Sequence, residues 1–280
     1  MSLADEISQW IKTKVEEAKA KGVVVGLSGG LDSSVVAALV KKALGDNVLG
    51  LIMPCQSNPI DEEDALLVVS RLNLKIEKVS LDVTYSKLLE TLPFGNKLAL
   101  ANLKPKLLET LPFGNKLALA NLKPKLLETL PFGNKLALAN LKPRLRMLIL
   151  YYFANSLNYL VAGTGNKSEI MAGYFTKYGD GGVDILPIGG LLKTEVRALA
   201  KEFNLPKKVL EKAPTAGLWP EQTDEDELGL TYHDLDEILK RLESNEITNL
   251  PQKLVIKVKK LVEISQHKRM LPLVFKQDLS

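Results

Sequence analysis

The fold is decided by residues 21–34, which read Lys-Gly-Val-Val-Val-Gly-Leu-Ser-Gly-Gly-Leu-Asp-Ser-Ser. The apolar run Val23–Val25 predicts a short buried strand, and apolar residues then recur with helical spacing from Val35 to Leu44. A turn rich in glycine and serine lies between them. Because a turn from a strand into a helix presents free backbone N–H groups and the positive end of the helix dipole, this segment predicts a phosphate site.

The side chains of the turn support a nucleotide. Gly29 and Gly30 are expected to take up positive φ and to let the backbone approach a ligand, while Ser28 and Ser33 add hydroxyl donors. Asp32 fits an anion site only if it holds a divalent cation that bridges the phosphates. The pattern matches neither G-x-x-x-x-G-K-[ST] nor G-x-G-x-x-G. The alternative is a turn capped by serine and aspartate that binds nothing.

Composition bounds the class of protein. The 280 residues are 46% hydrophobic and 25% charged, as in a globular protein of one large or two small domains. A net charge of +4 is too mild to favour a nucleic-acid partner. Cys55 is the single cysteine, so it fits a reducing compartment and is expected to be a buried filler rather than a nucleophile. No apolar run approaches the roughly 18 residues of a membrane span, and Met1–Gly22 predicts an amphipathic helix. We therefore expect a cytoplasmic protein without a membrane partner.

An internal repeat interrupts the chain. Residues 87–105, 106–124 and 125–143 are the same 19 residues, Lys-Leu-Leu-Glu-Thr-Leu-Pro-Phe-Gly-Asn-Lys-Leu-Ala-Leu-Ala-Asn-Leu-Lys-Pro, without one difference. Diverged structural repeats keep a pattern and drift elsewhere, so identity indicates a recent or engineered duplication. Each copy predicts a short helix, a turn and a second short helix, with its final proline in the first turn of the next helix. We expect the two extra copies to form a helical insertion on the surface of a single 1–280 domain, because surface insertions cost little loop entropy.

The remaining elements alternate. Strands are predicted at 47–54, 75–82 and 158–165, and helices at 61–72, 144–158 and 255–264. This order predicts an α/β fold with a parallel sheet covered by helices on both faces. The helix from Arg144 is apolar almost all round, which predicts burial within the domain or in a subunit interface. Ligands of such sheets bind at the carboxyl ends of strands, where the Ser28 turn, Met53-Pro54 and Gly163-Thr164-Gly165 are all expected to lie.

The chain resembles known families at several motifs. Ser-Gly-Gly-x-Asp-Ser after a first strand is similar to the loop of the ATP pyrophosphatases, which split ATP to AMP and pyrophosphate. Residues 163–169 and 173–184 resemble one group of them, the ammonia-dependent NAD synthetases. Further matches are Leu186-Pro187 with Lys193, Pro214–Leu218, Gln222–Glu225, Glu227–Gly229 and His267-Lys268-Arg269. The resemblance covers the whole chain except the extra repeats.

The resemblance implies a fold and a reaction. It implies a Rossmann-type fold of the adenine-nucleotide alpha-hydrolase kind. It also implies a ligase for the last step of NAD biosynthesis, which converts deamido-NAD, ATP and ammonia to NAD, AMP and pyrophosphate through an adenylylated nicotinate carboxylate. Such a reaction needs charge neutralisation and alignment more than a protein nucleophile. Because the chain is too short for a glutaminase domain as well, ammonia is expected to be taken free or delivered by another protein.

The resemblance also assigns residues. Asp32 and Lys193 are implied as catalytic, and Asp32 and Glu169 as ligands of Mg²⁺. Glu169 alone is equally well explained as an acid in the first turn of a helix, and Met53 alone as a core methionine. The implied ATP contacts are Gly26, Leu27, Ser28, Gly29, Gly30, Leu31, Asp32, Ser33, Met53, Thr164, Lys193 and Thr215.

The implied contacts of deamido-NAD are Arg144, Lys177, Asp184, His267 and Lys268, and three of these are the cations that a phosphate-bearing substrate needs. His267 by itself indicates an ordinary surface or capping histidine, and Asp180 a turn. The family usually has a small residue such as alanine before the first arginine, where this chain has Pro143 at the end of the repeats. The family also works as a homodimer, so we expect the repeats near the subunit interface.

Other functions stay open at this point. A tRNA-modifying or nucleotide-amidating ATP pyrophosphatase is the nearest alternative enzyme, although neither a basic extension nor zinc-type cysteine pairs are present. A non-catalytic nucleotide-binding scaffold is another class of protein, and a synthetase inactivated by the repeats is a third. Turnover of ATP that depends on deamido-NAD separates all three from an active synthetase.

Overall fold

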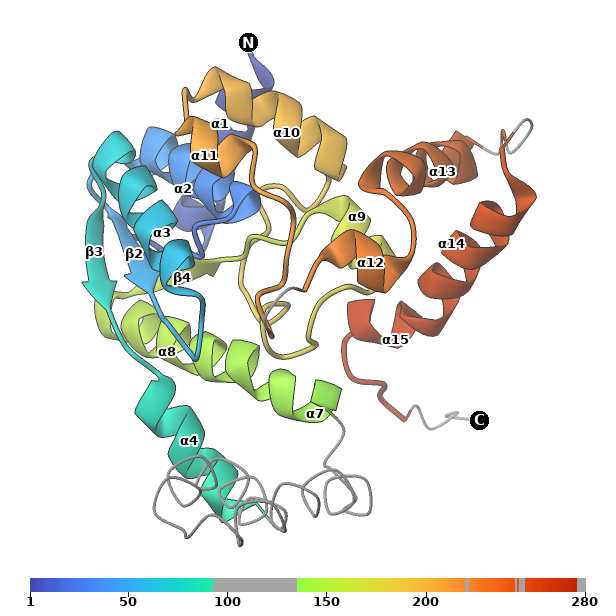
Figure 1. The fold of residues 1–280 in the computed structure, drawn as a ribbon. Helices are drawn as coiled ribbons and strands as arrows, with labels where there is room; N and C mark the ends of the chain where they lie inside the picture. Colours follow the sequence, from blue (N-terminus) through green and yellow to red (C-terminus); the bar gives the residue numbers. More distant parts are fainter. Residues whose placement is uncertain (93–134, 220–221, 245, 247–249, 276–280) are drawn as a thin grey trace, which may run out of the picture.

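A parallel sheet forms the centre of the protein. The computed structural model describes residues 1–92, 135–219, 222–244, 246 and 250–275. Four strands, β1 (Gly22–Gly26), β2 (Val48–Ile52), β3 (Lys75–Lys78) and β4 (Tyr159–Ala162), pair in the order β3-β2-β1-β4, all parallel (Figure 1). The predicted α/β architecture is confirmed.

Helices cover both faces of the sheet because β1 is apolar on both sides. Val23 and Val25 point into one core with α1 (Leu3–Glu17), α2 (Leu31–Leu44), α3 (Pro59–Leu72) and α10 (Lys193–Glu202). Val24 points into the opposite core with α4 (Asp82–Thr91) and α8 (Leu141–Leu157). Successive side chains of a strand point to opposite faces of the sheet, and here helices cover both faces. Val23–Val25 therefore has to be apolar at every position.

A second, helical layer packs beside the sheet layers. It consists of α9 (Lys167–Ala172), α12 (Asp224–Leu228), α13 (Tyr232–Ser244) and α14 (Gln252–Ile264), with the buried Leu235, Ile238 and Val258 in its core. Figure 1 shows α13 and α14 on the far side of α9 and α12 from the sheet. The short helices α7 (Lys135–Ala139), α11 (Lys207–Leu210) and α15 (Gln266–Arg269) complete the described part.

Several element boundaries differ from the predictions. The third strand ends at Lys78 rather than Asp82, because Asp82 begins α4. Helix α8 begins at Leu141, three residues before the predicted start, and holds Pro143 in its first turn as expected. We expected α8 to be buried within the domain or in a subunit interface. The first alternative does not hold, since Leu148 is 60% and Tyr152 63% exposed, and the second stays a prediction. One side of α8 packs on β1 and β4, and among the described residues the other side is open.

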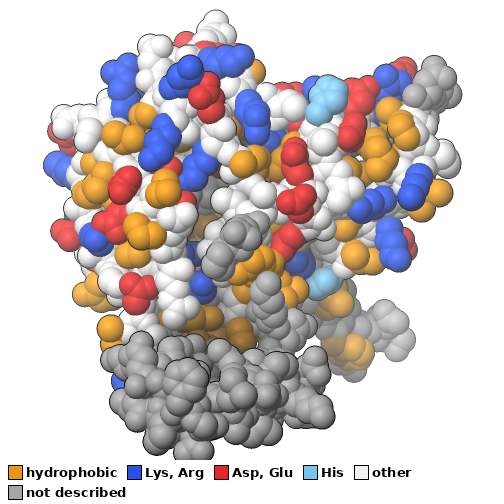
Figure 2. Space-filling view, in the orientation of Figure 1, with side chains coloured by type: hydrophobic (Ala, Val, Ile, Leu, Met, Phe, Trp, Pro, Cys, Tyr) orange, Lys and Arg blue, Asp and Glu red, His pale blue; other side chains and the backbone are white. Residues whose placement is uncertain are grey.

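The described surface carries both signs of charge. Figure 2 shows Lys and Arg side chains interspersed with Asp and Glu over one face. Many of the ion pairs are exposed, such as Lys14–Glu17 and Lys207–Glu211, and contribute little to stability. Within the described ranges, no helix combines the length and the apolar composition needed to cross a bilayer.

The two described ends of the repeat region pack together. The first copy supplies Lys87–Leu92 to α4 and its end, and the third copy supplies Lys135–Pro143 to α7 and the start of α8. Tyr85 Oη donates to the carbonyl of Leu138 at 3.2 Å, and Leu89 is buried in the same core as Leu138. The predicted helices at the start of a copy and in its second half are therefore seen once each. Residues 93–134 lie outside the described residues.

These halves make up one complete copy once Pro93–Asn96 joins them. We predict that deletion of residues 97–134 leaves the melting temperature within about 4 °C of the parent, a change of about 1 kcal/mol, because every described contact of α4, α7 and α8 is kept. Thermal unfolding by circular dichroism measures this. A deletion chain that fails to fold would show that the extra copies belong to the core.

Candidate functional site

The site lies where the order of the strands reverses. β2 pairs on one side of β1 and β4 on the other, so the switch point falls between β1 and β4. The carboxyl ends of β1, β2 and β4 lead into the Ser28 turn, Met53-Pro54 and Gly163-Thr164, and all three segments line one cavity of about 1020 Å³. The predicted convergence of these three strand ends is confirmed.

The Ser28 turn is held by its own hydroxyls. Ser28 N donates to Ser33 Oγ at 3.3 Å, Gly30 N donates to Ser28 Oγ at 3.2 Å, and Ser33 Oγ donates to the carbonyl of Gly30 at 3.0 Å. Gly29 has φ +71°, and a Cβ there would lie 2.2 Å from the carbonyl oxygen of Asp61, so only glycine fits against α3. The prediction of positive φ for Gly30 is wrong: as the N-cap of α2 it is extended, with φ −90°.

A buried ammonium joins two carboxylates beside this turn. Lys193 Nζ donates to Asp32 Oδ2 and, at 3.1 Å, to Glu169 Oε1, and the lysine side chain is only 4% exposed. Lys193 Nζ also lies 5.0 Å from the centroid of the Tyr232 ring. Burial lowers the pKa of Lys193, but Asp32 and Glu169 outweigh it and raise this pKa above the ordinary value. Lys193 therefore stays charged.

Glu169 serves the helix and the site together. Its Oε2 accepts from Asn166 N at 3.2 Å while Asn166 Oδ1 accepts from Glu169 N at 3.0 Å, which is a capping box at the start of α9. Its Oε1 faces Lys193. Burial, with the nearby charge of Asp32, raises the pKa of Glu169 to about 7 despite Lys193. Glu169 thus caps α9 and also faces Lys193 in the cavity.

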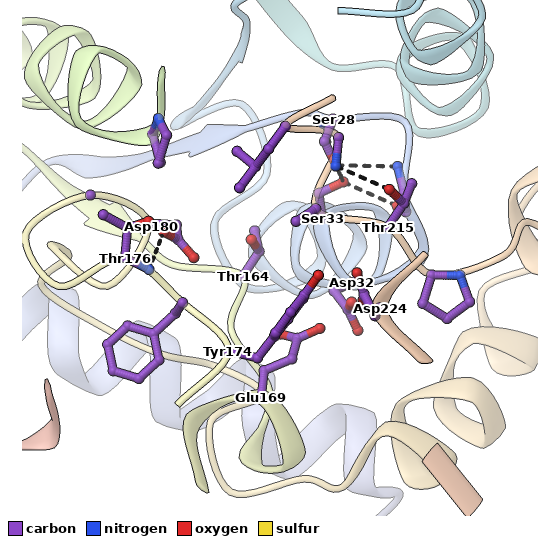
Figure 3. Close-up of a pocket in the computed structure, with 18 of the residues that line it drawn as sticks. Ser28, Asp32, Ser33, Thr164, Glu169, Tyr174, Thr176, Asp180, Thr215 and Asp224 are labelled. Atoms are coloured by element: carbon purple, nitrogen blue, oxygen red, sulfur yellow. Dashed lines mark hydrogen bonds between the residues drawn. The ribbon is translucent and has the colours of Figure 1, made fainter. Parts of the chain in front are cut away.

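A third carboxylate lies close to this pair. Figure 3 shows Asp224 beside Asp32 and Glu169 in the cavity. Tyr232 Oη donates to Asp224 Oδ2 at 3.0 Å and lies 3.4 Å from Glu169 Oε1. Asp224 is 3% exposed, and its Oδ1 has no hydrogen-bond partner among the described residues. Burial raises the pKa of Asp224.

One buried aspartate aligns the elements that carry Glu169 and Lys193. Asp236 of α13 accepts from Ser168 Oγ and, at 2.8 Å, from Thr194 N, while Ser168 Oγ accepts from Lys193 N at 2.9 Å. The three bonds connect α13, the start of α9 and the first turn of α10. Asp236 is therefore a positioning residue for the carboxylate and the ammonium of the site.

The donor set fits a divalent cation. Asp32, Glu169 and Asp224 set three carboxylates against the single ammonium of Lys193, and Asp224 Oδ1 is an unsatisfied acceptor. Mg²⁺ takes one or two carboxylates together with phosphate oxygens and water, so two protein ligands suffice. Among the described residues, no three His, Cys, Asp or Glu side chains are placed to hold a metal ion by themselves.

Most of the predicted ATP contacts meet in the cavity. Those that line it are Gly26, Leu27, Ser28, Gly30, Leu31, Asp32, Ser33, Met53, Thr164, Lys193 and Thr215, whereas Gly29 packs against α3. Thr215 comes from the segment between α11 and α12, where its Oγ1 accepts from Gly217 N at 3.1 Å. Thr215, Ser28 and Ser33 line the same cavity (Figure 3).

The predicted deamido-NAD contacts are placed differently. His267 and Lys268 line the cavity, but Arg144, Lys177 and Asp184 do not. Lys177 Nζ donates to the carbonyls of His267 and Met270 at 2.6 and 2.9 Å, and Arg144 Nη2 donates to that of Lys177 at 3.5 Å. Arg144, Lys177 and His267 therefore form one chain of contacts, and Lys268 follows His267 in the sequence. Asp184 lies apart, where it accepts from Tyr151 Oη and from Val161 N.

Comparison with known proteins agrees with this geometry. The sequence profile described as NAD synthase matches residues 3–122 and 115–272, two ranges that overlap inside the repeats. The chain belongs to the NAD synthase family. It is 47% identical over 273 residues to an NH(3)-dependent NAD(+) synthetase of Carboxydothermus hydrogenoformans, covering 96% of this chain and 94% of that protein. It is 46% identical over 287 residues to that of Methanocaldococcus jannaschii, covering 96% and 95%.

Solved structures of the family share the fold. An NMN synthetase from Francisella tularensis superposes with a TM-score of 0.77 at 32% identity, over 99% of this chain and 100% of that one. An NH3-dependent NAD synthetase from Campylobacter jejuni, in complex with the nitrate ion, has a TM-score of 0.72 at 29% identity, over the same shares. The Rossmann-like fold of the ATP pyrophosphatases, implied by the sequence, is thereby confirmed.

Several residues of the site were not singled out from the sequence. Arg146 lines the cavity and donates through Nε to the carbonyl of Met53 and through Nη2 to Ser57 Oγ, both at 3.1 Å. Asp224, Tyr232 and Asp236 were also not assigned. Asp224 falls within the matched segment Gln222–Glu225, which was the available signal for it. Tyr232 and Asp236 occupy an ordinary amphipathic helix, where spacing alone gives no sign of a site.

The raised pKa of Glu169 predicts how stability depends on pH. In the folded protein the carboxyl of Glu169 stays protonated up to about pH 7, whereas an unperturbed glutamate has a pKa of 4.5. The free energy of unfolding therefore falls as the pH rises from 4.5 to 7. Glu169→Gln removes that loss. In metal-free buffer with a chelator, its melting temperature should exceed that of the parent by about 2–5 °C at pH 8 and match it at pH 5. Glu202→Gln, at the exposed end of α10, is the control. A difference that does not grow with pH contradicts the prediction.

Proposed function

We propose that this chain is the ligase of the last step of NAD biosynthesis, joining ammonia to the nicotinate carboxylate of deamido-NAD with ATP as the energy source. Membership of the NAD synthase family supports this, as do relatives that are named NH(3)-dependent NAD(+) synthetases. The observation that carries the proposal is local. A serine-glycine turn at the switch point faces Lys193, which lies between Asp32 and Glu169.

The reaction divides into two displacements. A carboxylate oxygen of deamido-NAD attacks the α-phosphorus of ATP, the bond to the β-phosphate oxygen breaks, and pyrophosphate leaves. Ammonia then attacks the acyl carbon, the bond to AMP breaks, and the nitrogen gives up its excess proton. In both steps negative charge develops on phosphate oxygens, and positioned donors stabilise it.

The residues of the site suit those demands. Backbone N–H groups and hydroxyls of the Ser28 turn would bind phosphate oxygens at the start of α2, and the Lys193 ammonium would neutralise charge at the α-phosphate. Asp32 and Glu169 would hold Mg²⁺, with Asp224 beside them. When bound, the ion supplies positive charge against the phosphates. Met53, at the end of β2, would line the adenine pocket.

For deamido-NAD we propose the five residues that the family resemblance implies. His267 and Lys268 line the cavity, and Arg144 and Lys177 are connected to them through the carbonyls of Lys177 and His267. Lys268 Nζ donates to the carbonyls of Gly173 and Phe175 at 2.8 and 2.9 Å. Lys268 is therefore a cation of the cavity lining, and Lys177 and Arg144 lie outside the lining but are connected to His267. We propose that these three cations meet the phosphates of the dinucleotide. Asp184 is the least supported of the five.

A second substrate deserves a place in the assay because one structural neighbour is an NMN synthetase. Its identity of 32% is lower than the 47% and 46% shared with the NAD synthetases, so deamido-NAD is the first choice. Nicotinate mononucleotide offers the same carboxylate without the adenylate half. Comparison of kcat/KM for the two acceptors decides between them.

We predict that AMP and pyrophosphate are released from Mg-ATP only when deamido-NAD is present, and that NAD appears when ammonium is added. Asp32→Asn should lower kcat by at least about 100-fold, because an anion that holds the site's cations is lost. Asp46→Asn, in the exposed pair with Lys41, is the matched control and should keep parental kcat. ATP binding without release would indicate a scaffold or a synthetase damaged by the repeats. An active Asp32→Asn would remove this residue from the mechanism.

We also propose a homodimer, through the open side of α8. Leu148 and Tyr152 are exposed one turn apart on this helix, and Leu157 is 40% exposed near its end. Exposed apolar patches of this kind mark association surfaces. The parent should sediment at twice the mass of its 30.8 kDa chain, and Leu148→Glu combined with Tyr152→Glu at the mass of one chain. A parent that sediments as a monomer contradicts this.

A further inference from the structure

The segment that brings Thr215 into the cavity is held at one point from two sides. Residues 211–219, between α11 and α12, contain no helix or strand, and Figure 1 shows this orange segment running from α11 toward α8. Leu218 N donates to Gln222 Oε1 at 2.8 Å, and the carbonyl of Leu218 accepts from Lys142 Nζ at 2.9 Å. Both main-chain groups of one residue are thereby fixed by side chains.

Lys142 is an unusual residue for this task. It is only 6% exposed, and no carboxylate of the described residues lies within salt-bridge distance of its ammonium. Its ammonium also lies over the ring of Tyr85, 5.5 Å from the ring centroid. Burial lowers the pKa of Lys142. A buried ammonium without an anion is costly. Its hydrogen bond to the carbonyl of Leu218 connects α8 to residues 211–219.

Lys142 also belongs to the repeats. Lys104, Lys123 and Lys142 occupy the same position in three identical 19-residue copies. Only Lys142 is followed by Arg144 and the rest of α8, which packs on β1 and β4. Covalent continuity with α8 therefore places this lysine, of the three, opposite Leu218.

We infer that Lys142 is a positioning residue that holds residues 211–219, which we call the Thr215 segment, against the nucleotide cavity. The ammonium anchors the segment on the α8 side while Gln222 anchors it on the α12 side, so that Thr215 is already in place when a nucleotide enters. An anchored segment does not have to be ordered on binding, and the cost of ordering would otherwise weaken affinity. The expected change in KM rests on the proposed function, whereas the anchoring itself rests only on the contacts of Lys142 and Leu218.

The test compares Lys142→Met with Lys104→Met and Lys123→Met, which change the same residue in the same sequence context. Lys142→Met should raise KM for ATP about tenfold or more, the loss expected of a hydrogen bond from a charged donor, with a smaller change in kcat. Amide hydrogen exchange in peptides that cover 211–219 should speed up in this variant alone. The other two variants should match the parent in both measurements.

Stability separates anchoring from a merely structural role. Methionine in place of a buried charge is not expected to lower the melting temperature strongly. If the methionine variant fails to fold, Lys142→Gln gives the same test, because glutamine is neutral and too short to reach Leu218. Parental KM and parental exchange in a folded Lys142 variant would overturn the inference, as would equal effects of all three lysine substitutions. If the parent does not turn over ATP, the proposed function fails, whereas the exchange comparison still decides the anchoring.

Discussion

The arrangement of this protein depends on the ammonium of Lys193 between Asp32 and Glu169. Lys193 is the first residue of α10, where the helix dipole disfavours a cation, and burial disfavours it further. Asp32 and Glu169 compensate its charge, and the ring of Tyr232 lies beside it. Because the two carboxylates come from α2 and α9, three helices have to meet at one point, and separating any of them would leave an uncompensated buried charge, at a cost of about 3–5 kcal/mol. This contact fixes the helical layer against the sheet layers, and Asp236 reinforces it from α13.

The same contact explains why the site is poised for a ligand. With Asp224 included, the carboxylates outnumber the ammonium, and the pKa of Glu169 rises to about 7 through burial and the charge of Asp32. The folded chain thus carries an electrostatic cost that a divalent cation would relieve. Evolved sites often hold such unfavourable arrangements because function requires them. Stability and function therefore oppose one another at Glu169, which also caps α9.

The sequence was sufficient where structure is local. The run Val23–Val25 and the turn that follows it specify a strand, a turn and a helix start within a few residues, so β1, α2 and the place of the site could be predicted. Contacts between residues that are distant in sequence could not be predicted. Asp236 meets Ser168 across 68 residues, and no pattern within α13 distinguishes this aspartate from one that faces solvent. The positive φ expected for Gly30 was wrong for a related reason, since α3 presses on Gly29 alone and leaves Gly30 extended as a helix cap.

The repeats show most directly what local sequence cannot predict. Three identical segments have identical propensities, yet the described contacts use the start of the first and the end of the third. Propensity cannot make that choice. It follows from what each copy is joined to: the first continues the helix that begins at Asp82, and the third continues into the helix that packs on β1 and β4. A buried lysine is tolerated at position 142 because tertiary structure supplies the carbonyl of Leu218 there, so the context of the fold, rather than the residues of the copy, gives that lysine its role.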